Sequence, residues 1–254
     1  MLLAVSICVA TIAGVLAIYL AARSAMRPKT DADTNDLAGS ILFRIAALHG
    51  LVLALVFAAE VAEYQQIEFE VATEANAVSD LFYDMDRYGA GEIASTVAAS
   101  LRSYLDLATG AEWSRLGEEL SLLDAAWEEW GNVYAAVLDL EPVNGRQEAL
   151  RDNMLANIGI VAEKRDLREF HAQSGLGYLF WSAAVLGVAM VAAGYFIYPP
   201  SKDTIILLSM FATYTGFILF TITAMSNPFS EPAAIQPTLL LDLSVELNAI
   251  GAAQ

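Results

Sequence analysis

The stretch from Ser40 to Tyr88 limits most strongly what this chain can fold into, because it predicts one very long helix. Its first half, Ile41 to Val61, is almost wholly apolar and long enough to cross a bilayer core, which takes roughly 20 helical residues. Its second half is rich in acidic residues, yet apolar residues still recur every three or four positions. No glycine or proline interrupts residues 51–88. We therefore expect a membrane helix that continues without a break into a polar helical region.

Composition indicates an integral membrane protein. Of the 254 residues, 57% are hydrophobic and only 17% are charged, and the mean hydropathy is +0.50. Three further segments are apolar enough to cross a bilayer: Met1 to Ala22, Gly175 to Tyr198 and Thr204 to Met225. The first of them lacks the basic start and the small-residue cleavage site of a signal peptide, so we expect a retained helix.

Between the second and third apolar segments, the sequence predicts an acidic bundle of helices. Residues 60–171 hold 23 acidic and 8 basic side chains, and the whole chain has a formal charge of −17. Apolar spacing predicts a short helix closed by Thr109-Gly110, an uninterrupted helix from Trp113 to Val137, and a last helix from Gln147 to His171. This spacing is typical of a bundle core and not of a cofactor site.

We therefore expect an all-α fold of four transmembrane helices, with the acidic helical bundle inserted between the second and the third. The predicted domains are residues 1–62 for transmembrane helices 1 and 2, 63–172 for the soluble acidic bundle, 173–226 for transmembrane helices 3 and 4, and 227–254 for a C-terminal tail.

Several classes of function are excluded by composition and motifs. The acidic balance argues against nucleic acid, which needs a basic surface. Cys8 is the only cysteine, which excludes a disulfide within the chain and a two-cysteine zinc motif. The phosphate-binding loops, zinc-protease motifs and serine-hydrolase motifs are missing, and neither histidine has a glutamate three residues before it. We expect no enzyme, cofactor or metal, and we expect the acid pairs at Glu118-Glu119 and Glu128-Glu129 to be solvated.

His49 lies well inside the second apolar segment, where an ionisable side chain is costly and faces a helix bundle or water. Two interpretations stay open, which are a neutral imidazole bonded to a neighbouring helix and a position in a pore. Small and hydroxyl residues of the third and fourth segments favour close helix packing over a pore lining. These residues are Ala183, Gly187, Ser209, Thr213, Gly216 and Thr223.

The basic residues of the short loops predict the orientation in the membrane. Five of the thirteen lysines and arginines lie in or beside these loops, namely Arg23, Arg27, Lys29, Arg44 and Lys202. The positive-inside rule places both loops in the cytoplasm, so the acidic bundle would be extracytoplasmic on the inner membrane of a bacterium. Lys164, Arg165 and Arg168, close to the third segment, oppose this assignment.

Five short motifs follow one another from Asn35 onward. They are Asn35-Asp36-Leu-Ala-Gly39, Glu74-Ala-Asn-Ala-Val78, Glu112-Trp113 after Tyr104, Arg165 with Arg168, and Asn227-Pro228-Phe229-Ser-Glu231. Together they resemble the bestrophin-like family of bacterial membrane proteins. The last motif also resembles the Asn-Pro-Phe-Gly-Glu segment of bestrophin chloride channels, in which a following acidic run binds calcium. Here Pro232-Ala-Ala follows instead, which argues against calcium gating.

The resemblance implies two membrane helices, a helical domain and two more membrane helices. It also implies a pentamer with the second membrane helix around the pore, and a cytosolic helical domain. This last implication conflicts with the loop charges, which we weigh more heavily because they belong to this chain.

Two functions stay open, which are a homo-oligomeric ion channel and a non-conducting, membrane-anchored sensor or partner-binding module. The channel is favoured by a polar stripe along the long helix, whose members lie within about 60° of His49 at 100° per residue. Acids repeated around an oligomer would attract cations. We therefore expect a cation-favouring channel whose partners are the lipid bilayer, copies of itself and inorganic ions. The pore-lining candidates are His49, Val56, Glu60, Glu63, Glu70 and Glu74.

Overall fold

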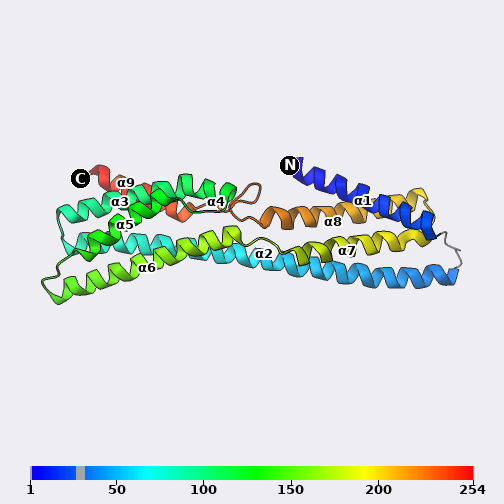
Figure 1. Cartoon of the computed structure of the whole chain (residues 1–254), viewed down its shortest axis with the longest axis horizontal. Helices are drawn as coiled ribbons and strands as arrows, with labels where there is room; N and C mark the ends of the chain where they lie inside the picture. Colours follow the sequence, from blue (N-terminus) through cyan, green and yellow to red (C-terminus); the bar gives the residue numbers. More distant parts are fainter. Residues whose placement is uncertain (1, 27–31, 254) are drawn as a thin grey trace. The chain divides into compact units, whose positions relative to one another are not determined.

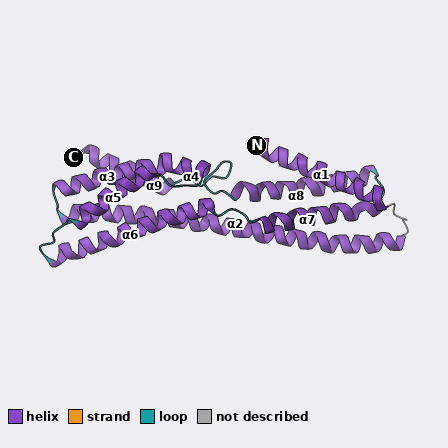
Figure 2. Ribbon diagram, viewed as in Figure 1, coloured by secondary structure: helices purple, strands orange, loops and turns teal. Residues whose placement is uncertain are grey.

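The computed structural model describes residues 2–26 and 32–253, and all regular structure in these ranges is helical, as predicted (Figure 2). The elements shown in Figure 1 are α1 (Leu2–Met26), α2 (Ala32–Tyr88), α3 (Glu92–Leu107), the π-helix η1 (Ala108–Glu112), α4 (Trp113–Glu119), α5 (Asp124–Leu138), α6 (Gly145–Gln173), α7 (Tyr178–Gly194), the 3-10 helix η2 (Tyr195–Ile197), α8 (Lys202–Met225) and α9 (Thr238–Ala253).

The chain forms two compact units. The first, called the membrane unit below, comprises Met1–Ala62 and Leu176–Ser226, and the second, called the distal unit, comprises Glu63–Gly175 and Asn227–Gln254. Four helical stretches in the described residues are long and apolar enough to cross a membrane. They lie in Leu2–Met26, Thr34–Tyr88, Gly145–Ile197 and Lys202–Met225, which agrees with the four predicted segments.

The predicted long helix is confirmed as α2, a single helix of 57 residues. It begins at Ala32, before the predicted start at Ser40, and it ends at Tyr88 as expected. Gly89 follows it with a φ of 79°, a left-handed conformation that terminates a helix and that glycine adopts without strain.

Close backbone approach holds the membrane unit together. A Cβ added at Gly216 on α8 would lie 3.1 Å from the Cα of Cys8 on α1, so the glycine lets these two helices meet, as the sequence predicted. At the end of α1, Arg23 Nη1 donates to the backbone oxygens of Phe196 and Tyr198, each at 2.8 Å. This contact ties the end of α1 to the turn before α8. Of the basic residues that predicted the orientation, Arg27 and Lys29 lie outside the described residues.

A single hydrophobic core fills the distal unit. The second half of α2, then α3, α5, α6 and α9 each contribute fully buried aliphatic residues, for example Leu81, Leu101, Val133, Met154 and Leu240. The C-terminal segment, predicted only as a tail, forms α9 and packs on α3 in this core.

Two helix boundaries in the distal unit differ from the prediction. Thr109-Gly110 does not close the helix from Glu92, because a π-helix, Ala108–Glu112, carries the chain on into α4. Ala108 and Glu112 are both fully buried, and this burial offsets the low helix propensity of Gly110.

The predicted uninterrupted helix from Trp113 to Val137 is also wrong. It breaks at Leu120, whose φ of 57° is left-handed, and α5 starts only at Asp124. Before α5, the backbone N–H of Leu123 donates to Glu112 Oε2 at 3.1 Å. A buried carboxylate thus satisfies the backbone at the break, and apolar spacing contains no signal of this partner.

Candidate functional site

Two acids on α2 face two basic residues on α6 inside the distal unit. Glu70 and Glu74 lie one turn apart, and so do Arg168 and His171. Arg168 Nη2 forms an ion pair with Glu74 Oε2. His171 Nε2 lies 3.3 Å from Glu70 Oε2, and its Nδ1 lies 2.9 Å from Glu63 Oε1. The two helices are therefore linked by the Arg168–Glu74 ion pair and by the contacts of the His171 ring with Glu63 and Glu70.

Glu112, from the π-helix, is the centre of this cluster. Its side chain is fully buried and forms ion pairs with Arg165, also fully buried, and with Arg168, whose Nη1 lies 3.3 Å from Glu112 Oε1. The N–H of Leu123 is a third donor to this carboxylate. We call Glu74, Glu112, Arg165 and Arg168 the buried charge cluster.

Aromatic rings surround the two arginines. The guanidinium of Arg165 lies 4.1 Å from the ring centre of Trp127 and 5.4 Å from that of Tyr104, and the guanidinium of Arg168 lies 5.1 Å from the ring of Trp113. Such cation–π contacts replace part of the hydration that a buried cation loses. Arg165 Nη1 is the one cluster atom that is buried without a hydrogen-bond partner among the described residues.

The protonation states follow from this environment. Burial lowers the pKa of Arg168 to about 9, and the carboxylate of Glu70 opposes this shift, so the side chain keeps its charge near neutral pH. Burial raises the pKa of the Tyr104 phenol, which therefore stays protonated and donates to Glu74 Oε1. The cluster thus pairs two cations with two carboxylates in an interior where an unpaired charge would be costly.

The segment from Asn227 to Phe229 docks beside this cluster. Asn227 Nδ2 donates to the backbone oxygen of Gly117, and Asn227 Oδ1 accepts from the N–H of Phe229, both at 3.1 Å. The Phe229 ring packs edge-on against Trp113 at 5.2 Å, and a Cβ on Gly117 would lie 2.6 Å from the Phe229 oxygen. The backbone oxygen of Pro228 accepts from the N–H of Ile235 at 2.8 Å.

The structure thus joins most of the motifs that the sequence singled out. Eight of these residues lie together in the distal unit, namely Glu74, Glu112, Trp113, Arg165, Arg168, Asn227, Pro228 and Phe229. The other three lie in the membrane unit. There the Tyr198 hydroxyl donates to the backbone oxygen of Asn35 at 3.2 Å and lies 3.1 Å from a Cβ added at Gly39, and Asp36 is exposed.

The pore-lining candidates have different surroundings in the two units. In the membrane unit, His49 is 6% exposed and lies against Gly187 of α7, where an added Cβ would be 2.2 Å from its Nδ1. Val56 is half-buried and packs against Leu53, Ala184 and Ile222, and Glu60 is buried. In the distal unit, Glu63 and Glu70 contact His171, and Glu74 contacts Arg168.

The sequence identified most of the residues in this site but not the residues that they contact. His171 was recognised only as an isolated histidine, and Trp127 only as bundle core, where it is half-buried beside Arg165. One signal was present, since Glu63 and Glu70 are seven residues apart and so share a face of α2. Among the described residues, no group of three or more His, Cys, Asp and Glu could hold a metal ion. The ion pairs of the buried charge cluster link α2, η1 and α6.

Two crystal structures of mutants of a bacterial bestrophin homolog from Klebsiella pneumoniae are similar to this chain. One has a TM-score of 0.66 at 10% identity and covers 95% of this chain and 99% of its own; the other has a TM-score of 0.65 at 12% identity and covers 96% and 98%. At such low identity the similarity shows a shared fold alone. No curated protein matches the sequence. Residues 9–240, most of the chain, match the family described as the Bestrophin-like domain. The chain therefore belongs to the bestrophin-like family.

Proposed function

We propose that this chain forms a homo-oligomeric ion channel in a bacterial inner membrane, with α2 of each copy lining the pore. The observation that carries the proposal is α2 itself, which runs unbroken from an apolar, membrane-crossing stretch into the acidic distal unit. Among the residues of α2 in the membrane unit whose burial the structure describes, 34–62, only Leu42, His49, Leu53 and Glu60 are buried. Most of its circumference is thus exposed within one copy, whereas the pore candidates His49, Val56 and Glu60 lie on its buried or half-buried side. Membership of the bestrophin-like family supports the proposal.

The proposed pore favours cations, and we assign this preference to Glu60 and Glu63. A ring of carboxylates around an oligomer concentrates cations and repels anions. Glu60 and Glu63 are chosen because they lie nearest the apolar half of α2. Glu74 contributes less to this potential, because Arg168 forms an ion pair with it, and His171 contacts both Glu63 and Glu70. His49 and Val56 are the proposed pore positions deeper in the membrane.

The experiment that tests this function combines oligomeric state with conductance. Protein purified in mild detergent is sized and then reconstituted in a planar bilayer under a salt gradient. We expect an oligomer whose reversal potential reports cation preference, and a weaker preference in Glu60→Gln/Glu63→Gln. The matched control is Glu118→Gln/Glu141→Gln, two exposed acids of the distal unit. No current from verified oligomers would contradict the channel, and a monomer would favour the non-conducting sensor or partner-binding module.

We further propose that the distal unit is a soluble acidic bundle inserted between the second and third membrane helices, on the extracytoplasmic side. The basic residues of the two short loops support this orientation. Val143 is 84% exposed in the distal unit, so Val143→Cys in a Cys8→Ser background gives a single accessible thiol. A membrane-impermeant reagent should label it in intact cells. Labelling that requires lysis would reverse the orientation.

A further inference from the structure

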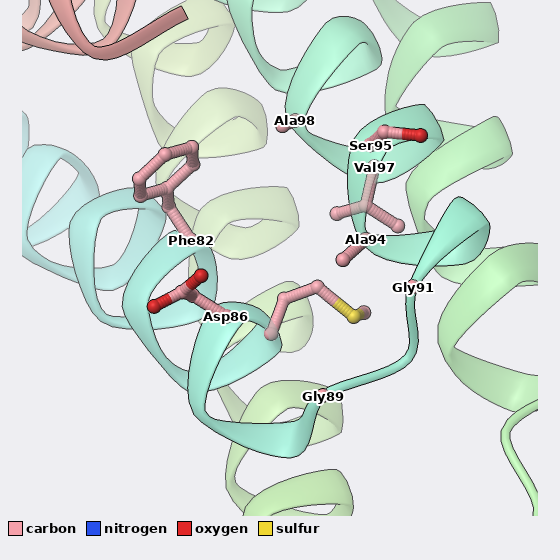
Figure 3. A pocket seen from close by; sticks show the side chains of 9 residues that line it. Phe82, Asp86, Gly89, Gly91, Ala94, Ser95, Val97 and Ala98 are labelled. Atoms are coloured by element: carbon pink, nitrogen blue, oxygen red, sulfur yellow. The ribbon is translucent and has the colours of Figure 1, made fainter. Parts of the chain in front are cut away.

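A cavity of about 390 Å³ lies in the distal unit where α2 ends and α3 begins (Figure 3). This volume is at the small end of the range for ligand pockets, roughly 300–1,000 Å³. Phe82 and Met85 of α2 and Val97 of α3 form a buried apolar wall, with exposures of 9%, 2% and 1%. The cavity is separate from the buried charge cluster, since none of the cluster residues lines it.

Small residues keep this space open. Ala94 and Ala98, one turn apart on α3, face the cavity where longer side chains would fill it. Gly89 and Gly91 form the turn at its mouth with φ values of 79° and 60°, and a Cβ added to either would meet nothing within 4 Å. The glycines are therefore required for the backbone conformation, and they leave the mouth without a covering side chain.

The charge at the cavity is negative. Asp86 lines it, and its carboxylate has no hydrogen bond or ion pair to any described residue. The adjacent Arg87 is paired with Asp84 at 3.0 Å. The C-terminus of α2 and the N-terminus of α3 carry opposite partial charges that largely cancel here. The electrostatic potential at the cavity is therefore negative because of the formal charges of Asp86 and of Glu92 in the first turn of α3.

We propose that this cavity binds a small organic cation with a short apolar body, such as an alkyl- or arylammonium ion. The apolar wall accommodates the body, and the Asp86 carboxylate pairs with the ammonium group. The Phe82 ring attracts a cation through its π face. Ser95 Oγ donates to the Glu92 oxygen at 2.7 Å, so its lone pairs are free to accept a hydrogen bond from the ligand.

Other occupants fit this chemistry less well. A hydrated inorganic cation would meet one carboxylate and an apolar wall that offers no ligands to replace its water. An anion would meet Asp86 without a compensating cation among the residues that line the cavity. The proposal does not depend on ion conduction, because it concerns binding to the distal unit alone.

The test compares three probes of nearly equal shape and different charge on the full-length protein in detergent. They are phenethylammonium, neutral 2-phenylethanol and anionic 3-phenylpropanoate, and binding is measured by isothermal titration and ligand-observed NMR. We expect phenethylammonium to bind with a dissociation constant on the order of 1 mM, typical of a ligand this small. Asp86 is exposed, so Asp86→Asn should weaken it roughly threefold, and Ala98→Leu, which fills the cavity, should abolish it.

The control is Glu118→Gln, an exposed acid that does not line the cavity, and it should change the affinity less than twofold. Thermal unfolding confirms that each variant is folded. Equal binding of the three probes would mean that the charge of the probe does not matter, as for partition into detergent or a cavity that takes uncharged molecules. This result would overturn the proposal. Unchanged binding in a folded Ala98→Leu protein would overturn it as well, whatever the outcome of the conductance experiment.

Discussion

The two units of this chain are held together by opposite means. In the membrane unit, helices meet at glycines, which have no side chain: Gly187 lies against His49 and Gly194 against Leu42. In the distal unit, large and charged side chains fill the interior, and Arg165 lies fully buried beside Trp127. Apolar residues gain little by leaving lipid for a helix interface, so membrane helices depend on close contact. A unit folded in water, as we propose for the distal unit, gains from apolar burial and can tolerate paired charges inside.

This comparison predicts different sensitivities. Adding atoms at a helix contact should damage the membrane unit, because the backbones are already close. Removing one partner of an ion pair should damage the distal unit, because the remaining charge would be buried alone.

The largest effect is expected in the buried charge cluster. Arg165→Met leaves Glu112 without its main partner, and we expect the free energy of unfolding to fall by about 3–5 kcal/mol. Chemical denaturation followed by near-ultraviolet circular dichroism measures it. Arg146→Met, at an exposed position, should cost less than about 0.5 kcal/mol.

The double variant Arg165→Met/Glu112→Leu sharpens the same point. Removing both charges abolishes the unpaired carboxylate, so the double variant should be more stable than the sum of the two single effects predicts, by at least about 1 kcal/mol. Strict additivity would mean that the two side chains do not act as a pair.

An intermediate effect is expected where α2 and α7 meet in the membrane unit. Gly187→Ala places a Cβ against the His49 ring, and overpacking of this kind typically costs about 1–3 kcal/mol. Gly50→Ala is the matched control on α2, since an added Cβ there meets nothing within 4 Å. Thermal unfolding in detergent should separate the two variants. Equal melting temperatures of the two variants would show that close packing at Gly187 does not stabilise the membrane unit.

The smallest effect concerns a feature that both units share. Asn144 accepts from the N–H of Gln147 at 3.0 Å to cap α6, and Ser201 accepts from the N–H of Thr204 at 3.2 Å to cap α8. Each alanine variant should lose about 1 kcal/mol, because a cap depends on local geometry and not on the interior of its unit. Ser114→Ala, in an exposed position within α4, is the control. If only one of the two alanine variants loses stability, the packing around the helix end matters more than the capping hydrogen bond.

The sequence predicted the fold where a local pattern extends over many residues. The continuous periodicity from Ser40 to Tyr88 predicted α2, and unbroken apolar stretches predicted the membrane helices. It failed at Leu120, where a non-glycine residue adopts a left-handed conformation that has no signature in apolar spacing. It failed likewise at Gly110, where tertiary burial overrides a residue that usually ends helices.

The sequence predicted which residues belong to the site but not how they are arranged in space. Glu112, Arg165 and Arg168 were recognised through a family resemblance, but their burial could not be inferred, since such side chains are almost always exposed unless paired. The pairing itself joins positions separated by 53 to 94 residues in the chain. Helix periodicity defines the face of a residue and contains no information on which other helix will meet that face.

The central proposal, that α2 lines an ion-conducting pore, is tested most directly by cysteine accessibility during conduction. Val56→Cys is made in the Cys8→Ser background, and its current in a planar bilayer is followed while a small thiol reagent is added. Met210→Cys, which is 64% exposed on α8, is the matched control. We predict that the reagent removes at least about half of the current at position 56 and leaves the control unchanged, because only a pore-lining modification obstructs ions. If the reagent blocks the current of Met210→Cys on α8 and not that of Val56→Cys on α2, the proposal that α2 lines the pore is contradicted.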